Sequence, residues 1–490
     1  MPVAAASTCA SHQPSAVPGR HVPLVSLLFL AFVSAVLLVF YRLPGRWQPT
    51  WLLAASYVFC ASYGWKVLAA LLALTVANFL LARPAALIGG RGRPTLYAAL
   101  AVNLGSLAFF KSAGLLLRDG VAAGTFMGID RSAAWWALPV GLSFYSLQAI
   151  SYQIDLRRGQ ISPQPGFVGL ALYLGYFPKL LAGPIERARS FLPQLTAERV
   201  LDADRLGGAL TLIVVGLVRK VLIGDPLWAK IPEAAFTSPE SASALLAWLA
   251  VYTIALYNDF AGYTSIARGV SSLFGIDLSP NFASPFLARS FTEFWNRWHI
   301  TLSQWLRDYV FVPLSRALLR RGFAFEGAVN VVVPAMLTML ASGLWHGTGW
   351  HMLVWGGLHG SYLVAEKARQ SIRPKPPPGT WPLPRRIAAA LAVVGVAIVS
   401  NAFFRLSVAD AVAFLGAALT PAAPPWPDPL VVLLVGLGFW IDWVQWRKRD
   451  ELVFLRWPPA ARRAALAAAL LALLVAFQFD TNTGFVYEEF

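Results

Sequence analysis

Long apolar runs separated by short basic loops are the main pattern of this chain. The clearest runs are residues 23–41, 387–404, 429–446 and 464–479. Each has the length and composition of a transmembrane helix, which needs roughly 18 or more predominantly apolar residues. The pattern predicts an all-α polytopic membrane protein with roughly ten or eleven transmembrane helices. We interpret the first run as a retained helix, because it is too long for a typical signal peptide.

Two further stretches do not fit simple crossings. Residues 166–183 lie between two basic loops and would have to enter and leave the membrane on one face. Residues 260–315 are amphipathic, aromatic and interrupted by Gly and Pro. Non-helical backbone at membrane depth is tolerated only where it is buried in protein or borders a water-filled cavity. We therefore predict re-entrant segments around a central cavity.

Lys and Arg in the loops predict the orientation of the helices. If the basic loops 367–386 and 447–463 are cytoplasmic, the stretch 406–428 between them lies outside, and it has no Lys or Arg. The Pro-rich segment 374–384 is then a stiff cytoplasmic linker. The same reasoning places the acidic C-terminal YEEF and the N-terminus outside.

Composition agrees with a membrane protein and argues against other classes. Hydrophobic residues make up 57% of the 490 residues and charged residues only 13%, whereas soluble domains have about 25% charged residues. Basic cytoplasmic loops explain the net charge of +16, so we predict no nucleic-acid partner. Cys9 and Cys60 predict neither a disulfide nor a metal site, and we expect Cys60 in the core.

The pattern divides the chain into five parts. They are an N-terminal extension (1–22), N-terminal transmembrane helices (23–132), a central core (133–366), a cytoplasmic Pro-rich linker (367–386) and C-terminal transmembrane helices (387–490).

Ionisable residues inside apolar segments are costly in a bilayer and therefore mark candidate functional sites. The first such cluster is FTEFWNRWHITLSQWLRDYV at residues 291–310. Glu293 and Arg297 are four residues apart and are expected to pair on a helix. An interfacial amphipathic helix with tryptophans at the headgroup level is an equal alternative for this segment.

A second cluster is YNDFAGY at residues 257–263, with Asn258 and Asp259 at the expected start of a broken segment. Asp442 is a further acid near a helix end. For these acids we favour a structural role as partners of Arg or of Trp N–H groups.

The third cluster is LASGLWHGTGWHMLVWGGLHG at residues 340–360, which holds three of the six histidines and no charged residue. For His351 and His359 we favour a structural role. Zinc is the obvious alternative, but no HExxH motif and no Cys or acidic residue at ligand spacing accompanies them, so we predict no metal.

Helix geometry places His346 within the membrane. The limbs 328–345 and 350–366 each rise about 25 Å at 1.5 Å per residue, and the hydrocarbon core is about 30 Å thick. The Gly-flanked turn at His346 should therefore lie in the outer half of the bilayer. An imidazole there can take a proton from a hydroxyl and return it to a leaving group.

These stretches resemble the membrane-bound O-acyltransferase (MBOAT) superfamily, and most of all its bacterial branch of alginate O-acetyltransferases and teichoic-acid D-alanyl transfer proteins. The motifs that carry the resemblance are LPVGLSFYSLQAISYQIDLRRG (138–159), YFPKLLAGPIER (176–187), YNDFAGYTSIARG (257–269), NFASPFLARSFTEFWNRWHITLSQWLRDYVFVPL (281–314) and LASGLWHGTGWHMLVWGGLHG (340–360).

The resemblance implies a ring of helices around a thin, water-accessible centre, with His346 as the catalytic residue and His299 as the second site residue. It implies that an acyl-thioester donor arrives from the cytoplasm and an acceptor from outside. The chain length favours the polysaccharide O-acetylation type, so the implied donor is acetyl-CoA and the implied product an O-acetylated exopolysaccharide such as alginate. The implied place is the bacterial inner membrane.

The implied partners are membrane lipid and a periplasmic SGNH-hydrolase-like acetyltransferase or polysaccharide-modifying complex. We expect loop arginines such as Arg187, Arg316 or Arg320 to meet the donor phosphates. The predicted substrate-binding residues are Trp345, Trp298, Asn296, Arg297, Ser303, Trp305, Asp308, Asn258, Asp259 and Pro184.

Two other classes of function stay open from the sequence. A proton-coupled glycan or lipid transporter would use the histidines as a proton path, and a structural subunit of an export complex would need no chemistry. Neither of these would consume a thioester.

Overall fold

The structure is a computed structural model of the chain, and it describes most of the residues. The described residues are 23–85, 92–122, 139–161, 165–196, 199, 202–232, 234–237, 241–320, 326–372, 381–417 and 428–478. The predicted N-terminal extension 1–22 and the acidic chain end therefore lie outside the described residues, as does most of the linker 374–384.

Helices form the fold, as the apolar pattern predicts, and the described residues contain no strand. The N-terminal helices are α1 (Leu27–Phe40), α2 (Gln48–Ser62), α3 (Trp65–Ala85), α4 (Arg93–Ala122), α5 (Leu142–Arg157), α6 (Phe167–Gly175), α7 (Ala188–Phe191), α8 (Ala203–Leu217), α9 (Asp225–Lys230) and α10 (Ala234–Thr237). The remaining helices are α11 (Ala242–Leu273), α12 (Phe291–Trp295), α13 (Ile300–Leu306), α14 (Val312–Leu319), α15 (Glu326–His346), α16 (Trp350–Ile372), α17 (Leu383–Arg405), α18 (Val408–Ala417), α19 (Pro429–Lys448) and α20 (Pro459–Gln478).

Seven helices in the described part of the chain are long and apolar enough to cross a membrane. They span Trp65–Ala82, Ala203–Lys230, Ser243–Leu273, Val329–His346, Leu383–Arg405, Pro429–Lys448 and Pro459–Phe477. The number is lower than the ten or eleven expected from the sequence, because several apolar runs form shorter or broken helices. The first run, for example, yields the 14-residue α1.

The segment 166–183 does not cross the membrane. Its helix α6 has nine residues and rises only about 14 Å. A short 3₁₀ helix, Phe177–Lys179, follows it, and residues 170–183 are buried within the protein. The backbone therefore turns back inside the protein, as the sequence predicted for a re-entrant segment.

The YNDFAGY stretch at 257–263 corrects one expectation. It lies in the middle of α11, an unbroken helix of 32 residues, so Asn258 and Asp259 do not begin a broken segment. Gly262 does not interrupt the helix. Its lack of a side chain instead allows α8 to approach closely. A Cβ at Gly262 would lie 2.7 Å from the carbonyl oxygen of Gly216 in α8. The chain becomes irregular only after Leu273, at the end of α11.

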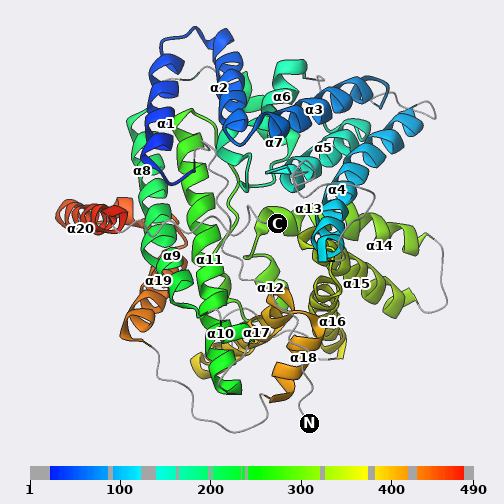
Figure 1. The fold of residues 1–490 in the computed structure, drawn as a ribbon, viewed down its shortest axis with the longest axis vertical. Coiled ribbons are helices and arrows are strands. Elements are labelled where there is room, and N and C mark those ends of the chain that lie inside the picture. The colour runs from blue at the N-terminus through cyan, green and yellow to red at the C-terminus, as the bar shows by residue number, and fades with distance from the viewer. Residues whose placement is uncertain are drawn as a thin grey trace.

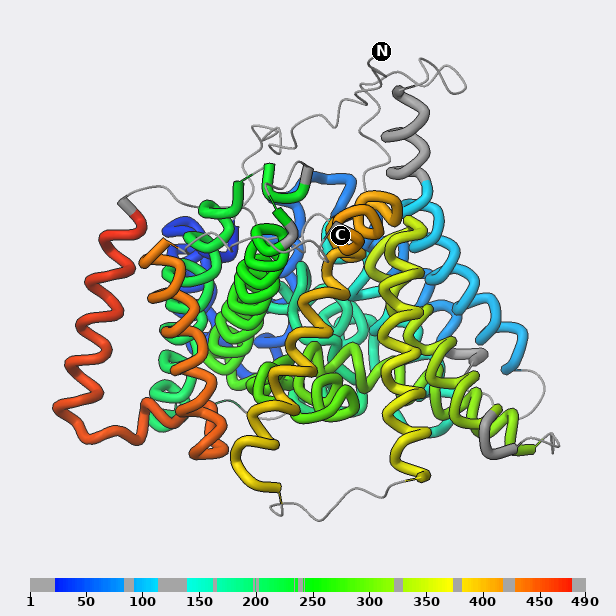
Figure 2. The backbone as a smooth tube through the Cα atoms, turned by 90° about the horizontal axis from the view of Figure 1, so that it is seen from below, coloured from blue at the N-terminus to red at the C-terminus, as the bar shows by residue number. Residues whose placement is uncertain are grey.

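The helices enclose a centre made of short segments. In Figure 1, α8 and α11 run side by side on one flank, α15 and α16 lie on the other, and α12 and α13 lie between them. In Figure 2, the end of α16, the start of α17 and the α19–α20 connection lie along one edge, and α18 lies at the opposite edge. The two basic loops 367–386 and 447–463 thus share a side, as the predicted orientation requires.

Glycines fix the close approach of α15 and α16, the two helices that bear the central histidine motif. A Cβ at Gly356 of α16 would overlap the carbonyl oxygen of Met339 and lie 3.2 Å from the Cα of Leu340 in α15. A Cβ at the neighbouring Gly357 would meet only the Leu340 side chain, at an ordinary 3.9 Å. Gly356 is therefore a position where the two backbones touch.

We predict that Gly356→Ala destabilises the protein by about 1–3 kcal/mol, because the added methyl group forces the two backbones apart. The measurement is the apparent melting temperature of purified protein in detergent. Gly357→Ala is the matched control, and its melting temperature should stay close to that of the wild type. Equal melting temperatures for both variants would contradict this account of the packing.

Candidate active site

His346 is the last residue of α15, where SGLWHG leaves the helix. Its side chain is buried, with 4% of the residue exposed, and it borders a small void of about 20 Å³. A void of this size holds roughly one water molecule. The other residues around the void are Thr253, Leu256, Phe286, Phe294, Trp295, Trp298, Trp355, His359, Ala397, Asn401 and Phe404.

Aromatic rings fix the orientation of the His346 imidazole. The ring centroids of Trp345, Trp355 and Phe404 lie 4.8, 5.3 and 5.2 Å from that of His346, each at a steep interplanar angle. Trp345 is itself anchored, because its indole Nε1 donates a hydrogen bond to the carbonyl oxygen of Ser143 at 3.2 Å. The Nζ of Lys111 in α4 donates to the Trp345 carbonyl. The end of α15 is therefore held from two other helices.

His299 lies one ring away from His346 and does not border the void. It precedes α13 in a left-handed conformation, with φ 41°, and is buried with 1% of the residue exposed. Its ring contacts those of Phe260 and Trp345, at centroid distances of 4.9 and 5.8 Å. Trp345 thus lies in contact with both histidines.

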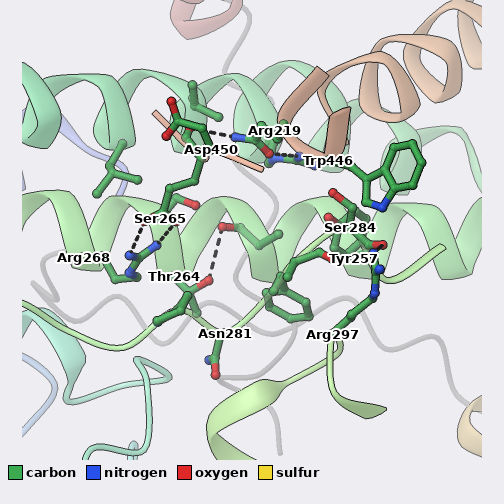
Figure 3. A pocket seen from close by; sticks show the side chains of 18 of the residues that line it. Arg219, Tyr257, Thr264, Ser265, Arg268, Asn281, Ser284, Arg297, Trp446 and Asp450 are labelled. Atoms are coloured by element: carbon green, nitrogen blue, oxygen red, sulfur yellow. Dashed lines mark hydrogen bonds and ion pairs between the residues drawn. The ribbon is translucent and has the colours of Figure 1, made fainter. Parts of the chain in front are cut away.

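A much larger cavity, of about 1100 Å³ (Figure 3), is lined in part by Arg447, Arg449, Asp450 and Glu451 of the basic loop 447–463. Its wall comes mainly from α11, from residues 280–284 and from the end of α19 and the turn that follows it. Arginines outnumber carboxylates in this wall. The arginines are Arg219, Arg268, Arg289, Arg297, Arg447 and Arg449, and the carboxylates are those of Asp450 and Glu451.

One ion pair organises the rim of this cavity. Arg268 donates from both terminal nitrogens to the two carboxylate oxygens of Glu451, at 2.6 and 2.7 Å. Burial raises the pKa of the Glu451 carboxyl, but the hydrogen bonds and charge of Arg268 outweigh burial and hold this pKa below its usual value. The pair therefore links α11 to the turn after α19. Among the other arginines of the wall, Arg219 pairs with Asp442, and Arg289 and Arg297 both pair with Glu293.

The two spaces are not connected. The sequence led us to expect a water-accessible centre around His346, but aromatic side chains fill the region between the cavity and the void. Tyr257 and Phe282 border the cavity, and Phe286 and Trp298 border the void. The centroids of Tyr257 and Trp298 are 5.9 Å apart, in ring contact. Aromatic rings therefore lie between the basic-side cavity and the void at His346 in this structure.

The structure brings together part of the predicted substrate-binding set. Trp298 borders the void, and Ser303 supports it by donating to its carbonyl oxygen at 3.2 Å. Arg297 borders the cavity and pairs with Glu293 at 2.7 Å, as the four-residue spacing predicts. Asn296 is exposed and ends α12.

The other predicted residues lie elsewhere. Trp305 donates to the carbonyl oxygen of Leu147 at 2.8 Å, and Asp308 lies beside arginines at the protein surface. Pro184 is buried and borders neither space. We therefore assign these three residues to the packing around the site.

Asn258 and Asp259 lie in buried polar networks. The Oδ1 of Asn258 accepts a hydrogen bond from Arg219 at 3.1 Å. Asp259 pairs with Lys220 at 2.6 Å, and Lys220 also pairs with Asp225 at 2.8 Å. The favoured structural role of Asp259 agrees with this pairing.

Arg187, Arg316 and Arg320, which the sequence suggested for the donor phosphates, are not in the wall of the cavity. The sequence also did not single out Asn401, Thr253 and Trp355 around the void, and it gave His359 a structural role. A signal was present for Asn401, because it is the one amide in the apolar run 387–404. Its Nδ2 donates to Thr253 at 2.9 Å.

Within the described residues, no three His, Cys, Asp or Glu side chains gather in a way that could hold a metal ion. Cys60 is buried, as expected for a core residue. The chemistry that the described groups offer is therefore that of a buried imidazole, a small void beside it, and an arginine-lined cavity behind an aromatic layer.

Comparison with known proteins identifies the family of the chain. Residues 121–409, more than half of the chain, match the model of the membrane-bound O-acyltransferase family, MBOAT. The chain belongs to this family of multi-pass membrane acyltransferases. The matched range contains the predicted catalytic core 133–366 and ends before α19.

The relatives act on different polymers, according to their names. The chain is 36% identical over 347 residues to a probable alginate O-acetylase, AlgI, of Azotobacter vinelandii, and the alignment covers 70% of this chain and 67% of that protein. It is 30% identical over 379 residues to a peptidoglycan O-acetyltransferase of Helicobacter pylori, with 71% and 70% covered. It is 30% identical over 224 residues to a teichoic acid D-alanyltransferase of Bacillus subtilis, with 45% and 56% covered. The chain thus spans about two thirds of the length of the first of these relatives.

We predict that a cysteine placed in the cavity is reached from the cytoplasm. Ser265 borders the cavity and is partly exposed. In a background with Cys9→Ser and Cys60→Ser, Ser265→Cys should react with a membrane-impermeant maleimide in inside-out vesicles and not in right-side-out vesicles. Thr253→Cys, at the small void, is the matched control and should stay unlabelled in both. Labelling of Ser265→Cys only from outside would reverse the orientation.

Proposed function

We propose that this protein transfers an acetyl group from cytoplasmic acetyl-CoA to a hydroxyl group destined for an extracytoplasmic polysaccharide, with His346 as the general base. One observation carries the proposal. The buried His346 imidazole borders a void of molecular size, and only a thin aromatic layer separates this void from a large arginine-lined cavity on the basic-loop side. The family membership supports acyl transfer as the reaction.

The cavity suits a nucleotide thioester. Guanidinium groups bind phosphate through paired, charge-assisted hydrogen bonds, and six arginines line this wall. We assign the phosphates of acetyl-CoA to these arginines, in place of the loop arginines that the sequence suggested. The thioester end would then point toward Tyr257 and the aromatic layer.

The reaction balances with one base. His346 takes the proton of the acceptor hydroxyl, and the oxygen attacks the acetyl carbonyl carbon. The carbon–sulfur bond then breaks, an ester forms, and the proton passes from the imidazole to the thiolate of CoA. General base catalysis of this kind typically contributes about 10²–10⁴-fold to the rate.

His299 is assigned a positioning role in this chemistry. It contacts Trp345, and Trp345 contacts His346, so we assign His299 the orientation of His346 rather than direct contact with the oxyanion. A ring held in one orientation keeps its basic nitrogen on the hydroxyl, and such positioning is a main source of enzymatic rate enhancement.

The acceptor side is proposed from the relatives. Two of them are named as O-acetylase and O-acetyltransferase of alginate and peptidoglycan, so a glycan hydroxyl is the acceptor class. A periplasmic SGNH-hydrolase-like acetyltransferase or a polysaccharide-modifying complex would take the group onward in the bacterial inner membrane. Which glycan is modified is a separate question from the chemistry at His346.

We predict that His346→Ala lowers acetyl transfer by about 10²–10⁴-fold, because it removes the base. The measurement is the transfer of radiolabelled acetyl from acetyl-CoA in membranes that contain equal amounts of wild-type and variant protein. His351→Ala is the matched control, since His351 lies in the same motif and does not border the void. Wild-type transfer by His346→Ala would reject the role, and substrate movement without transfer would favour a transporter.

We predict that the small void limits the length of the acyl group. Butyryl-CoA, whose acyl group is two methylenes longer, should be used at least about tenfold less efficiently than acetyl-CoA, because even one extra methylene in a tight pocket typically changes kcat/KM by about 10- to 200-fold. The measurement is kcat/KM for acetyl-, propionyl- and butyryl-CoA. Leu256→Ala, which enlarges the void, should raise the butyryl value relative to the acetyl value. Equal use of all three donors would show that the void does not receive the acyl group.

A further inference from the structure

The helix α11 borders both the void and the cavity. Its lining residues pass from the void to the cavity between two consecutive positions, Leu256 and Tyr257. Thr253 and Leu256 border the void, whereas Tyr257, Ser265 and Arg268 border the cavity. A helix rises 1.5 Å per residue, so the change from void to cavity occurs within a layer about one side chain thick. Tyr257 occupies this layer.

Four rings make up the layer, and we call them the aromatic barrier: Tyr257, Phe282, Phe286 and Trp298. The centroid of Tyr257 lies 5.5 Å from Phe282 and 4.9 Å from Phe286. That of Trp298 lies 5.3 Å from Phe282 and 6.3 Å from Phe286. Each ring thus packs against two or more others, and no polar atom other than the Tyr257 hydroxyl and the Trp298 indole N–H belongs to the barrier.

A single residue of α19, Asp442, holds the barrier from two sides. Its Oδ1 accepts a hydrogen bond from the Tyr257 hydroxyl at 2.8 Å, and its backbone carbonyl accepts one from the Ser284 hydroxyl at 3.1 Å. Ser284 stands two residues before Phe286 and has a left-handed conformation with φ 51°, which is uncommon for a residue with a Cβ. Asp442 therefore ties both the α11 side and the loop side of the barrier.

Arg219 links Asp442, and with it these hydrogen bonds, to the cavity. Its guanidinium donates to the Oδ1 of Asp442 and, at 3.1 Å, to the Oδ1 of Asn258, and it lies over the Tyr257 ring at 5.3 Å. Arg219 also borders the cavity (Figure 3). One carboxylate oxygen thus serves both the cavity arginine and the barrier tyrosine, so a group in the cavity that draws Arg219 toward itself also draws on Asp442, away from the Tyr257 hydroxyl.

From these contacts we propose that Asp442 is a positioning residue that keeps the aromatic barrier shut, and that the donor opens the barrier by engaging Arg219 and displacing the Tyr257 hydroxyl from Asp442. The inference rests on the proposed function, because it needs a thioester that travels from the cavity to His346. The barrier keeps cavity water from the void, where water would take the acetyl group. In that side reaction the thioester and water give acetate and the free thiol of CoA.

The helix that carries Asp442 lies beyond the range that matches the family, residues 121–409. The barrier residues themselves lie inside that range. The C-terminal helix α19 is thus assigned a part in the reaction: it controls the passage of the donor, although it contributes no group to the chemistry at His346.

We predict that Tyr257→Phe loosens the barrier, because it removes only the hydroxyl that Asp442 holds. The ratio of acetate formed to acetyl transferred should rise about 2- to 10-fold, the range expected for one lost hydrogen bond of ordinary strength. Both products are measured from radiolabelled acetyl-CoA with purified protein in lipid vesicles. Asp442→Asn should raise the same ratio of acetate to transferred acetyl. In this variant kcat for transfer should fall by a larger factor than the affinity for the donor.

Tyr252→Phe is the matched control, since Tyr252 is a buried tyrosine of the same helix that borders neither space. Its ratio should equal that of the wild type. An unchanged ratio in Tyr257→Phe, while the wild type transfers acetyl and His346→Ala does not, would overturn the barrier inference and leave the proposed function standing.

A second measurement does not depend on activity. Thr253→Cys, at the void, should be protected from a small methanethiosulfonate reagent applied from the cytoplasmic side, and should become reactive when Tyr257→Phe is added. Reactivity that is the same with and without Tyr257→Phe would overturn the inference even if no acetyl transfer were found. If the wild type transferred no acetyl but Thr253→Cys became reactive on addition of Tyr257→Phe, the proposed function would be rejected and the barrier inference would stand.

Discussion

The central constraint on this structure is that charged groups at membrane depth must find partners within the protein. Arg219 pairs with Asp442, and Lys220 pairs with Asp225 and Asp259. Removing one member of a buried pair typically costs about 3–5 kcal/mol, because the other charge is left uncompensated. These pairs join the π-helical turn 218–224, α11 and α19, so they determine how the three elements lie against one another. The cavity wall and the aromatic barrier both depend on that arrangement.

The opposite flank is held by a different kind of contact. Between α15 and α16 the backbones touch at Gly356, and a Cβ at Gly343 of α15 would overlap the carbonyl oxygen of Met352 in α16. Here close van der Waals packing takes the place of ion pairs, as is usual between membrane helices with small residues. His346 ends the first of these two helices and takes its position from them. The site thus lies where a flank fixed by charge meets a flank fixed by glycine contacts.

The sequence predicted the features that depend on local pattern. Apolar length predicted the helices, Lys and Arg in the loops predicted that the two basic loops share a side, and glycines predicted that α15 would end at His346. It did not predict the pairs between distant segments, such as Arg219 with Asp442, because residue spacing carries no information on which helices become neighbours. For the same reason it favoured loop arginines over those of the cavity wall. It also led us to expect a centre open to water. An aromatic-rich segment has the same sequence pattern whether its rings line a path or fill it.

The inferred aromatic barrier suits the chemistry proposed for the site. A base that activates a hydroxyl also activates water, so transfer to a hydroxyl acceptor needs a site from which water is excluded. A small void satisfies that need, but it also excludes a donor as large as a nucleotide thioester. A protein with both requirements must separate a large binding cavity from a small reacting space and must open the wall between them only for the donor. A layer one ring thick, tied by hydrogen bonds to a residue that also contacts a cavity arginine, meets both requirements with few atoms.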